Sequence, residues 1–97
     1  MNLYLFCDAG MSTSLMVTKM QKAAEEKGIE ATIQAFPLSS VEDKSKEADV
    51  VLLGPQVKYM LDDVKKKVTD KPVMVIDMQQ YGMMQGDKVL DQALELV

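Results

Sequence analysis

Short apolar segments alternate along the chain with segments of helical period. Four apolar segments are rich in β-branched, aromatic or other apolar residues and have the length of strands. They lie at residues 2–6, 31–36, 50–53 and 73–76. Each is bounded by polar or glycine-containing stretches, so the pattern predicts four strands.

Between and after these runs, apolar residues recur every three or four positions, which predicts amphipathic helices. The expected helices are one that ends at Gly28, a short polar one up to Lys46, one over residues 57–68, and one that begins with a cap at Asp87. A loop that contains Gly82 and Gly86 is expected between the fourth strand and the last helix.

Strands that alternate with helices predict parallel βαβ units. The runs "VVLL" and "VMVI" are apolar throughout, as in strands that are buried on both sides. We therefore expect an α/β fold, a single domain over residues 1–97 with an open four-stranded parallel sheet and helices on both faces. In such sheets ligands bind outside the carboxyl ends of the strands, near the point where the strand order reverses. Cys7 directly follows the first strand, which places the only cysteine at this edge.

Composition and charge narrow the chemistry that this edge can support. The 97 residues include one cysteine and no histidine, so no intrachain disulfide is possible, and neither a metal nor a cofactor is expected. Fifteen acidic residues outnumber eleven basic ones, all of them lysine, and this charge balance argues against a nucleic-acid partner. No apolar run approaches the roughly 20 residues of a membrane span, so we expect a cytoplasmic protein.

The stretch "CDAGMSTS" carries the candidate chemistry. Residues 8–14 lead from the strand into a helix, where backbone amides without helical acceptors can converge on an anion. Gly10 permits close approach of the backbone, and the hydroxyl residues that follow add donors. A helix N-terminus also favours the nucleophilic thiolate. The pattern fits a phosphoryl group carried on the sulfur of Cys7, but it equally fits an inert core cysteine followed by ordinary helix caps.

Low-molecular-weight tyrosine phosphatases and the related arsenate reductases offer an alternative reading. They place a Cys-x5-Arg-Ser/Thr loop after the first strand of a similar sheet, whereas here the residue six after Cys7 is Thr13, and the chain has no arginine. Hydrolysis needs a guanidinium to hold the phosphoryl oxygens in the transition state. A loop of neutral donors is expected to bind phosphate but to hydrolyse it poorly, which describes a carrier.

Four stretches, "YLFCDAGMSTSLMVTKM", "ADVVLLGPQVKYML", "KPVMVID" and "YGMMQGDKVL", resemble the IIB component of the lactose/cellobiose family of the bacterial sugar phosphotransferase system. The resemblance covers essentially the whole chain. It implies that a phosphohistidine on the IIA protein donates its phosphoryl group to Cys7, and that a sugar presented by the membrane IIC component receives it. Cellobiose, lactose, chitobiose or a similar β-glycoside is the implied sugar, and the protein is expected to associate with IIC from the cytoplasm.

The resemblance also implies the residues of the site. Its phosphate loop corresponds to Asp8, Ala9, Gly10, Met11, Ser12, Thr13 and Ser14. Asp8 departs from the small neutral residue expected there, and a carboxylate beside the thiol is expected to repel an incoming phosphoryl group. Tyr81 and Gln56 are expected in loops that follow the fourth and third strands, where they would form the rim of the cysteine loop.

Overall fold

The computed structural model describes residues 1–8 and 10–97, without the side chains of Met11 and Ser12. Its sheet has four strands, all parallel, in the order β2-β1-β3-β4, which confirms the predicted α/β fold. The strands are β1 (Asn2–Cys7), β2 (Thr32–Pro37), β3 (Val50–Leu53) and β4 (Val73–Val75). They agree with the predicted runs to within one residue at either end.

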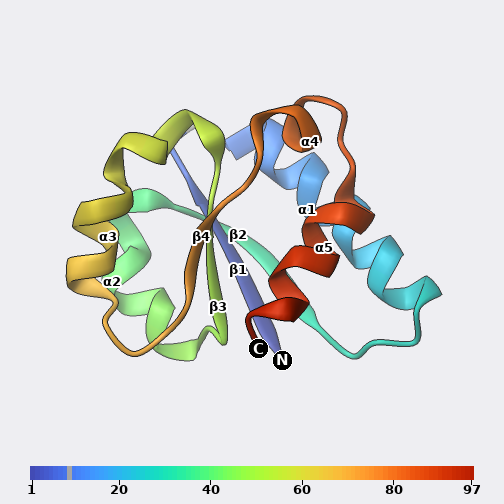
Figure 1. Ribbon diagram of the computed structural model, residues 1–97, viewed down its shortest axis with the longest axis horizontal. Helices are drawn as coiled ribbons and strands as arrows, with labels where there is room; N and C mark the ends of the chain where they lie inside the picture. The colour runs from blue at the N-terminus through green and yellow to red at the C-terminus, as the bar shows by residue number, and fades with distance from the viewer. Residues whose placement is uncertain (9) are drawn as a thin grey trace.

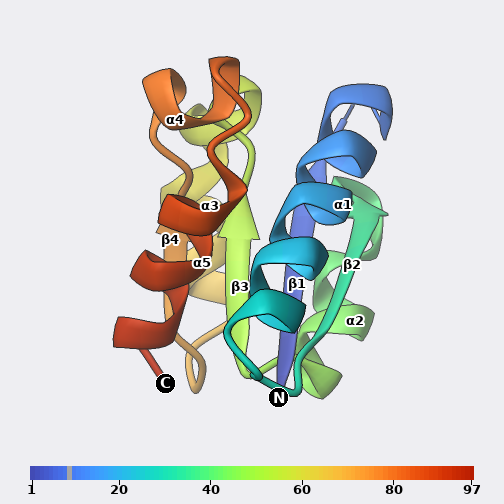
Figure 2. The ribbon, with the colours of Figure 1, turned by 90° about the vertical axis from the view of Figure 1, so that its right-hand side faces the viewer.

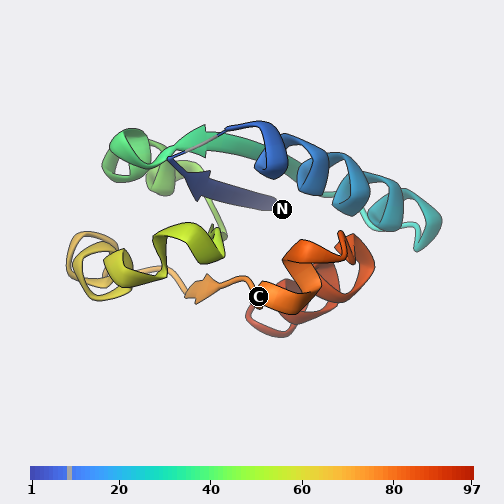
Figure 3. The same ribbon diagram turned by 90° about the horizontal axis from the view of Figure 1, so that it is seen from above.

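Helices cover both faces of the sheet, as predicted. Viewed from above, α1 and α5 lie on one side of the strands, and α2 and α3 lie on the other (Figure 3). The helices are α1 (Gly10–Glu26), α2 (Val41–Lys44), α3 (Leu61–Lys67), α4 (Met78–Gly82) and α5 (Gly86–Glu95). Gly28, which follows α1, has a φ of 68°, the left-handed conformation expected of a residue that ends a helix. Short 3-10 turns flank α2 at both ends and precede α3.

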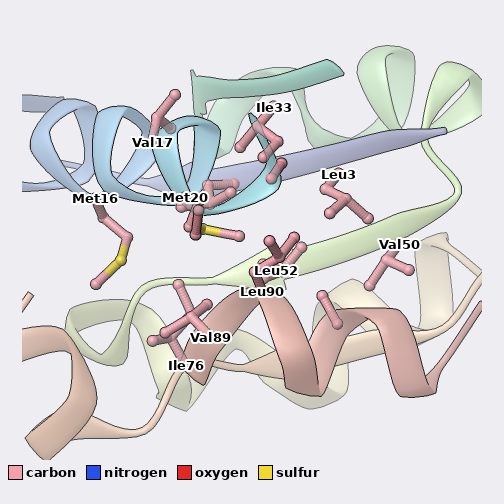
Figure 4. Packing of buried hydrophobic residues seen from close by; sticks show 14 of the residues in the cluster. Leu3, Met16, Val17, Met20, Ile33, Val50, Leu52, Ile76, Val89 and Leu90 are labelled. Carbon is pink, nitrogen blue, oxygen red and sulfur yellow. The ribbon is translucent and has the colours of Figure 1, made fainter. Parts of the chain in front are cut away.

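The alternation of side chains along β1 divides the interior into two cores. Leu3 and Leu5 pack in the core beneath α1 and α5, whereas Tyr4 and Phe6 pack in the core beneath α2 and α3. In Figure 4, side chains from the strands, from α1 and from α5 converge on the first of these cores. The labelled members are Leu3, Met16, Val17, Met20, Ile33, Val50, Leu52, Ile76, Val89 and Leu90. All four residues of β3 are buried, so this strand is covered on both faces and its run "VVLL" has no polar position.

The segment between β4 and the last helix differs from the sequence prediction. Residues 78–82, expected in a loop, form the helix α4, and the side chain of Asp77 caps it by accepting a hydrogen bond from the backbone N–H of Gln80 at 3.0 Å. α5 begins at Gly86 with Gln85 as its N-cap, so Asp87 lies in the first turn and is not the cap. A helix of five residues is too short to show a helical period, which is why the pattern missed it.

The strand order reverses between β1 and β3. From β1 the chain goes to β2 on one side, and it then returns across the sheet to β3 on the other side of β1 (Figure 1). The start of α1 and the whole of α4 lie at the carboxyl end of the strands, and both chain termini lie at the opposite end (Figure 2). Across residues 1–8 and 10–97, no helix has the length and apolar character needed to cross a bilayer.

Gly86 allows the start of α5 to pack closely on α1, and its replacement tests that contact. A Cβ at Gly86 would lie 2.6 Å from Lys19 Cβ and 2.8 Å from the backbone nitrogen of Met20. Gly86→Ala should therefore lower the free energy of unfolding by about 1–3 kcal/mol, measured by urea denaturation. Gly82→Ala is the matched control, because a Cβ at Gly82 meets no atom within 4 Å. Equal unfolding midpoints for the two variants would contradict this packing.

Candidate active site

Cys7 ends β1 at the reversal of the strand order, as the sequence predicted. Its side chain retains only 2% of its surface exposed, and it lines a small hollow of about 160 Å³. The hollow is lined by Cys7, Asp8, Thr13, Ser14, Ala35, Phe36 and Pro37. The thiol is therefore almost fully buried and borders a hollow of the surface.

Two polar side chains lie close to the sulfur. The Cys7 Sγ lies 3.7 Å from Gln56 Oε1 and 3.9 Å from Asp8 Oδ1, and the thiol can donate to either oxygen. Gln56 comes from the turn that follows β3, so β1 and β3 both contribute to the site. Asp8 is exposed, which leaves its carboxylate hydrated and partly screened by solvent.

Gly54 makes the approach of Gln56 to the thiol possible. It follows β3, and its N–H donates to the carbonyl of Phe6 at 3.0 Å, which holds the two strand ends together. A Cβ at this position would lie 2.8 Å from Gln56 Oε1 and 3.3 Å from Cys7 Sγ. The sequence predicts that Gly54, in the loop after the third strand, borders the cysteine loop, but the need for glycine there depends on β1 and β3 being neighbours.

The predicted phosphate loop is described in part. Asp8 lies beside the thiol, Gly10 begins α1, and Thr13 and Ser14 line the hollow, whereas Ala9 and the side chains of Met11 and Ser12 lie outside the described residues. Because α1 begins three residues after Cys7, the N–H groups of its first turn lack helical acceptors and carry partial positive charge. This arrangement favours an anion at the mouth of the hollow.

The two predicted rim residues have different positions. Gln56 is exposed beside the thiol, as a rim residue would be. Tyr81 is 5% exposed and belongs to α4, and its hydroxyl lies 3.1 Å from Thr13 Oγ1, so it contacts a loop residue from a buried position. No pattern in the sequence indicated this pairing, because the two residues are 68 positions apart.

The side of the hollow formed by β2 was not predicted from the sequence. Cys7 pairs in register with Pro37 at the end of β2, and Phe36 precedes it, so β2 supplies an apolar wall. Among the described residues that line the hollow there is no lysine. The described residues also contain no group of three or more His, Cys, Asp or Glu that could hold a metal ion. The site thus combines a nucleophilic sulfur with neutral donors and a helix N-terminus, a set that can bind a phosphoryl group without a cation.

Comparison with known proteins identifies the family. The profile of the family "PTS system, Lactose/Cellobiose specific IIB subunit" matches residues 2–92. The galactose-specific EIIB component of Lactococcus lactis subsp. cremoris is 49% identical over 100 residues, which cover 96% of this chain and 93% of that protein. The cellobiose-specific EIIB component of Lactococcus lactis subsp. lactis is 48% identical over 100 residues, with the same two coverages of 96% and 93%.

A solved structure agrees with these relatives. The solution structure of the cellobiose-specific phosphotransferase IIB component from Borrelia burgdorferi has a TM-score of 0.83 at 37% identity, and the alignment covers 99% of this chain and 90% of that chain. The resemblance drawn from the four sequence stretches is thus confirmed. The chain belongs to the lactose/cellobiose-specific IIB subunits of the phosphotransferase system, and as a phosphoryl carrier of that family it is a phosphotransferase component of sugar transport.

Proposed function

We propose that Cys7 is the residue that carries the phosphoryl group. The observation that supports this most directly is the position of the thiol: it ends β1 at the reversal of the strand order and lines a hollow against the start of α1. Ligands of open parallel sheets bind at this point. Cys7 is also the only cysteine and the chain has no histidine, so no other side chain matches it as a phosphoryl acceptor.

The proposed reaction has two balanced steps. In the first, the sulfur of Cys7 attacks the phosphorus of a phosphohistidine on the IIA protein, the S–P bond forms, and the N–P bond breaks. The proton lost by the thiol balances the one gained by the departing imidazole. In the second step a sugar hydroxyl oxygen attacks the phosphorus, the S–P bond breaks, and the proton lost by the hydroxyl balances the one that restores the thiol.

The loop over residues 8–14 is proposed to hold the phosphoryl group between these steps. The N–H groups at the start of α1 and the hydroxyls of Thr13 and Ser14, which line the hollow, supply neutral donors. The amide of Gln56 lies close enough to the sulfur to turn its NH2 group toward a phosphoryl oxygen. With no cation among the described lining residues, attack by water gains little stabilisation, which suits a carrier better than a phosphatase.

The proposed partners are the phosphorylated IIA protein and the membrane IIC component. Leu15 near the start of α1, Met78 in α4 and Met83 just after α4 are large apolar side chains that are 48%, 62% and 62% exposed. The start of α1 and α4 lie at the same end of the sheet as Cys7 (Figure 2). Exposed apolar side chains on these elements and just after α4 favour contact with other proteins near the thiol. We place the chain in the cytoplasm, as one domain over residues 1–97 that associates with IIC.

The sugar is proposed to be a β-glycoside such as cellobiose, lactose or chitobiose. Two relatives of nearly equal identity, 49% and 48%, bear the names of different sugars, galactose and cellobiose. The overall sequence identity between this chain and its relatives therefore does not indicate which sugar is phosphorylated. We infer that the IIC component, which binds the sugar, makes the selection.

Replacing the nucleophile tests the central step. With radiolabelled phospho-IIA as donor, the wild-type protein should become labelled on Cys7 and release little free phosphate, whereas Cys7→Ser should remain unlabelled. The label should show the acid and base stability of a phosphorylated thiol. Rapid release of free phosphate, or rapid turnover of an aryl phosphate by the wild-type protein that is lost in Cys7→Ser, would favour the phosphatase alternative and overturn the proposal.

Gly54→Ala tests the approach of Gln56 to the thiol. The added Cβ displaces the flexible end of Gln56, so the rate of labelling should fall by roughly tenfold while the unfolding midpoint changes little. Gly82→Ala, which meets no neighbouring atom within 4 Å, should label at the wild-type rate. A normal labelling rate in Gly54→Ala would show that Gln56 takes no part.

Asp8→Asn tests the effect of the carboxylate. Removing a negative charge beside the sulfur should raise the initial labelling rate by about threefold at low ionic strength, and the difference should vanish near 1 M salt, where the screening length is about 3 Å. Asp43→Asn, at an exposed position of α2, makes the same charge change elsewhere and should have no such effect. A slower Asp8→Asn variant would contradict the repulsion.

A further inference from the structure

The hydroxyl groups of Thr13 and Tyr81 form a buried hydrogen bond with each other. The two residues are 1% and 5% exposed, and their hydroxyl oxygens lie 3.1 Å apart. Thr13 lines the hollow that contains Cys7, whereas Tyr81 lines a second, apolar hollow of about 260 Å³ beside Gln56 and Met78. The hydrogen bond therefore connects Thr13, which lines the first hollow, to Tyr81 of α4, which lines the second.

The direction of this hydrogen bond decides what Thr13 can do. Either hydroxyl could donate across this 3.1 Å contact, and we assign Tyr81 as the donor and Thr13 Oγ1 as the acceptor, because a phenol is a stronger acid than an aliphatic alcohol. The Thr13 hydroxyl has a single hydrogen, and with Tyr81 as the donor this hydrogen is not donated to Tyr81. Because Thr13 lines the hollow with Cys7, that hydrogen is left available to an acceptor in the hollow, such as a phosphoryl oxygen.

We propose that Tyr81 is a positioning residue for phosphoryl transfer, which acts by orienting the Thr13 hydroxyl toward the phosphoryl group on Cys7. The inference rests on the proposed role of Cys7 and goes beyond it. Thr13 occupies the place, six residues after the cysteine, where the phosphatase loop carries arginine. A neutral donor in that place contributes most when its direction is fixed before the phosphoryl group arrives, since no reorganisation is then needed during the transfer.

Tyr81→Phe removes the hydroxyl and keeps the buried ring. With labelled phospho-IIA as donor, we expect kcat for labelling of Cys7 to fall about fivefold, while KM for phospho-IIA stays unchanged. Tyr4→Phe is the matched control, because Tyr4 is also buried, at 6% exposed, but lies in the core on the other side of the sheet. A purely structural role of Tyr81 would lower the unfolding midpoint and leave kcat unchanged, and that result would overturn the inference.

A double-mutant cycle shows whether Tyr81 acts through Thr13. Thr13→Val removes the hydroxyl at nearly constant shape, and in that background Tyr81→Phe should cause no further loss of kcat. Thr13→Ser keeps the hydroxyl and should restore both the rate and its dependence on Tyr81. Equal losses from Tyr81→Phe in the two backgrounds would overturn the inference. Absence of label on wild-type Cys7 would instead overturn the proposed function, so the two failures are distinguishable.

Discussion

The pairing of β1 with β3 is the constraint on which the site depends. It brings the residue that ends β1 and the turn that follows β3 to one point, where the Gly54 N–H donates to the carbonyl of Phe6 at 3.0 Å. Because position 54 has no side chain, the thiol and Gln56 can occupy the same small space. A shift of one residue in this register would turn Cys7 toward the opposite face and separate it from α1. The geometry around the thiol is therefore set by a backbone contact between the ends of two strands.

The two cores hold this contact in place without taking part in it. Successive residues of β1 pack into opposite cores, so the strand cannot slide or turn without exposing apolar surface on one side. The functional groups all lie at the carboxyl end of the sheet, where the strands stop and polar loops begin. The residues of the cores are thus separated along the strands from the polar groups at the carboxyl end. The loop sequences can therefore vary without disturbing the cores.

Much of the fold could be predicted from the sequence, because each strand and long helix produces its own local pattern. The run "VVLL" corresponds to β3 residue for residue, and Cys7 is found at the predicted edge. The features that were missed are those with no local pattern. α4 is too short for a helical period, the apolar wall from Phe36 and Pro37 requires the order of the strands, and the partnership of Thr13 with Tyr81 spans 68 positions. Tertiary contacts, and not propensities, create these parts of the site.

A carrier must bind a phosphoryl group firmly enough to protect it from water, yet weakly enough to release it. An arginine at the position of Thr13 would stabilise the transition state for any attacking oxygen, including that of water. Neutral donors stabilise the phosphoryl group less than an arginine would. Transfer therefore depends on the groups that the partner protein places on the exposed side of the phosphorus. In this chain the hollow closes around the sulfur, while α4 and the start of α1 present apolar side chains to the surface. Under the proposed function, specific docking, and not a strong catalytic group within the carrier, determines which acceptor receives the phosphoryl group.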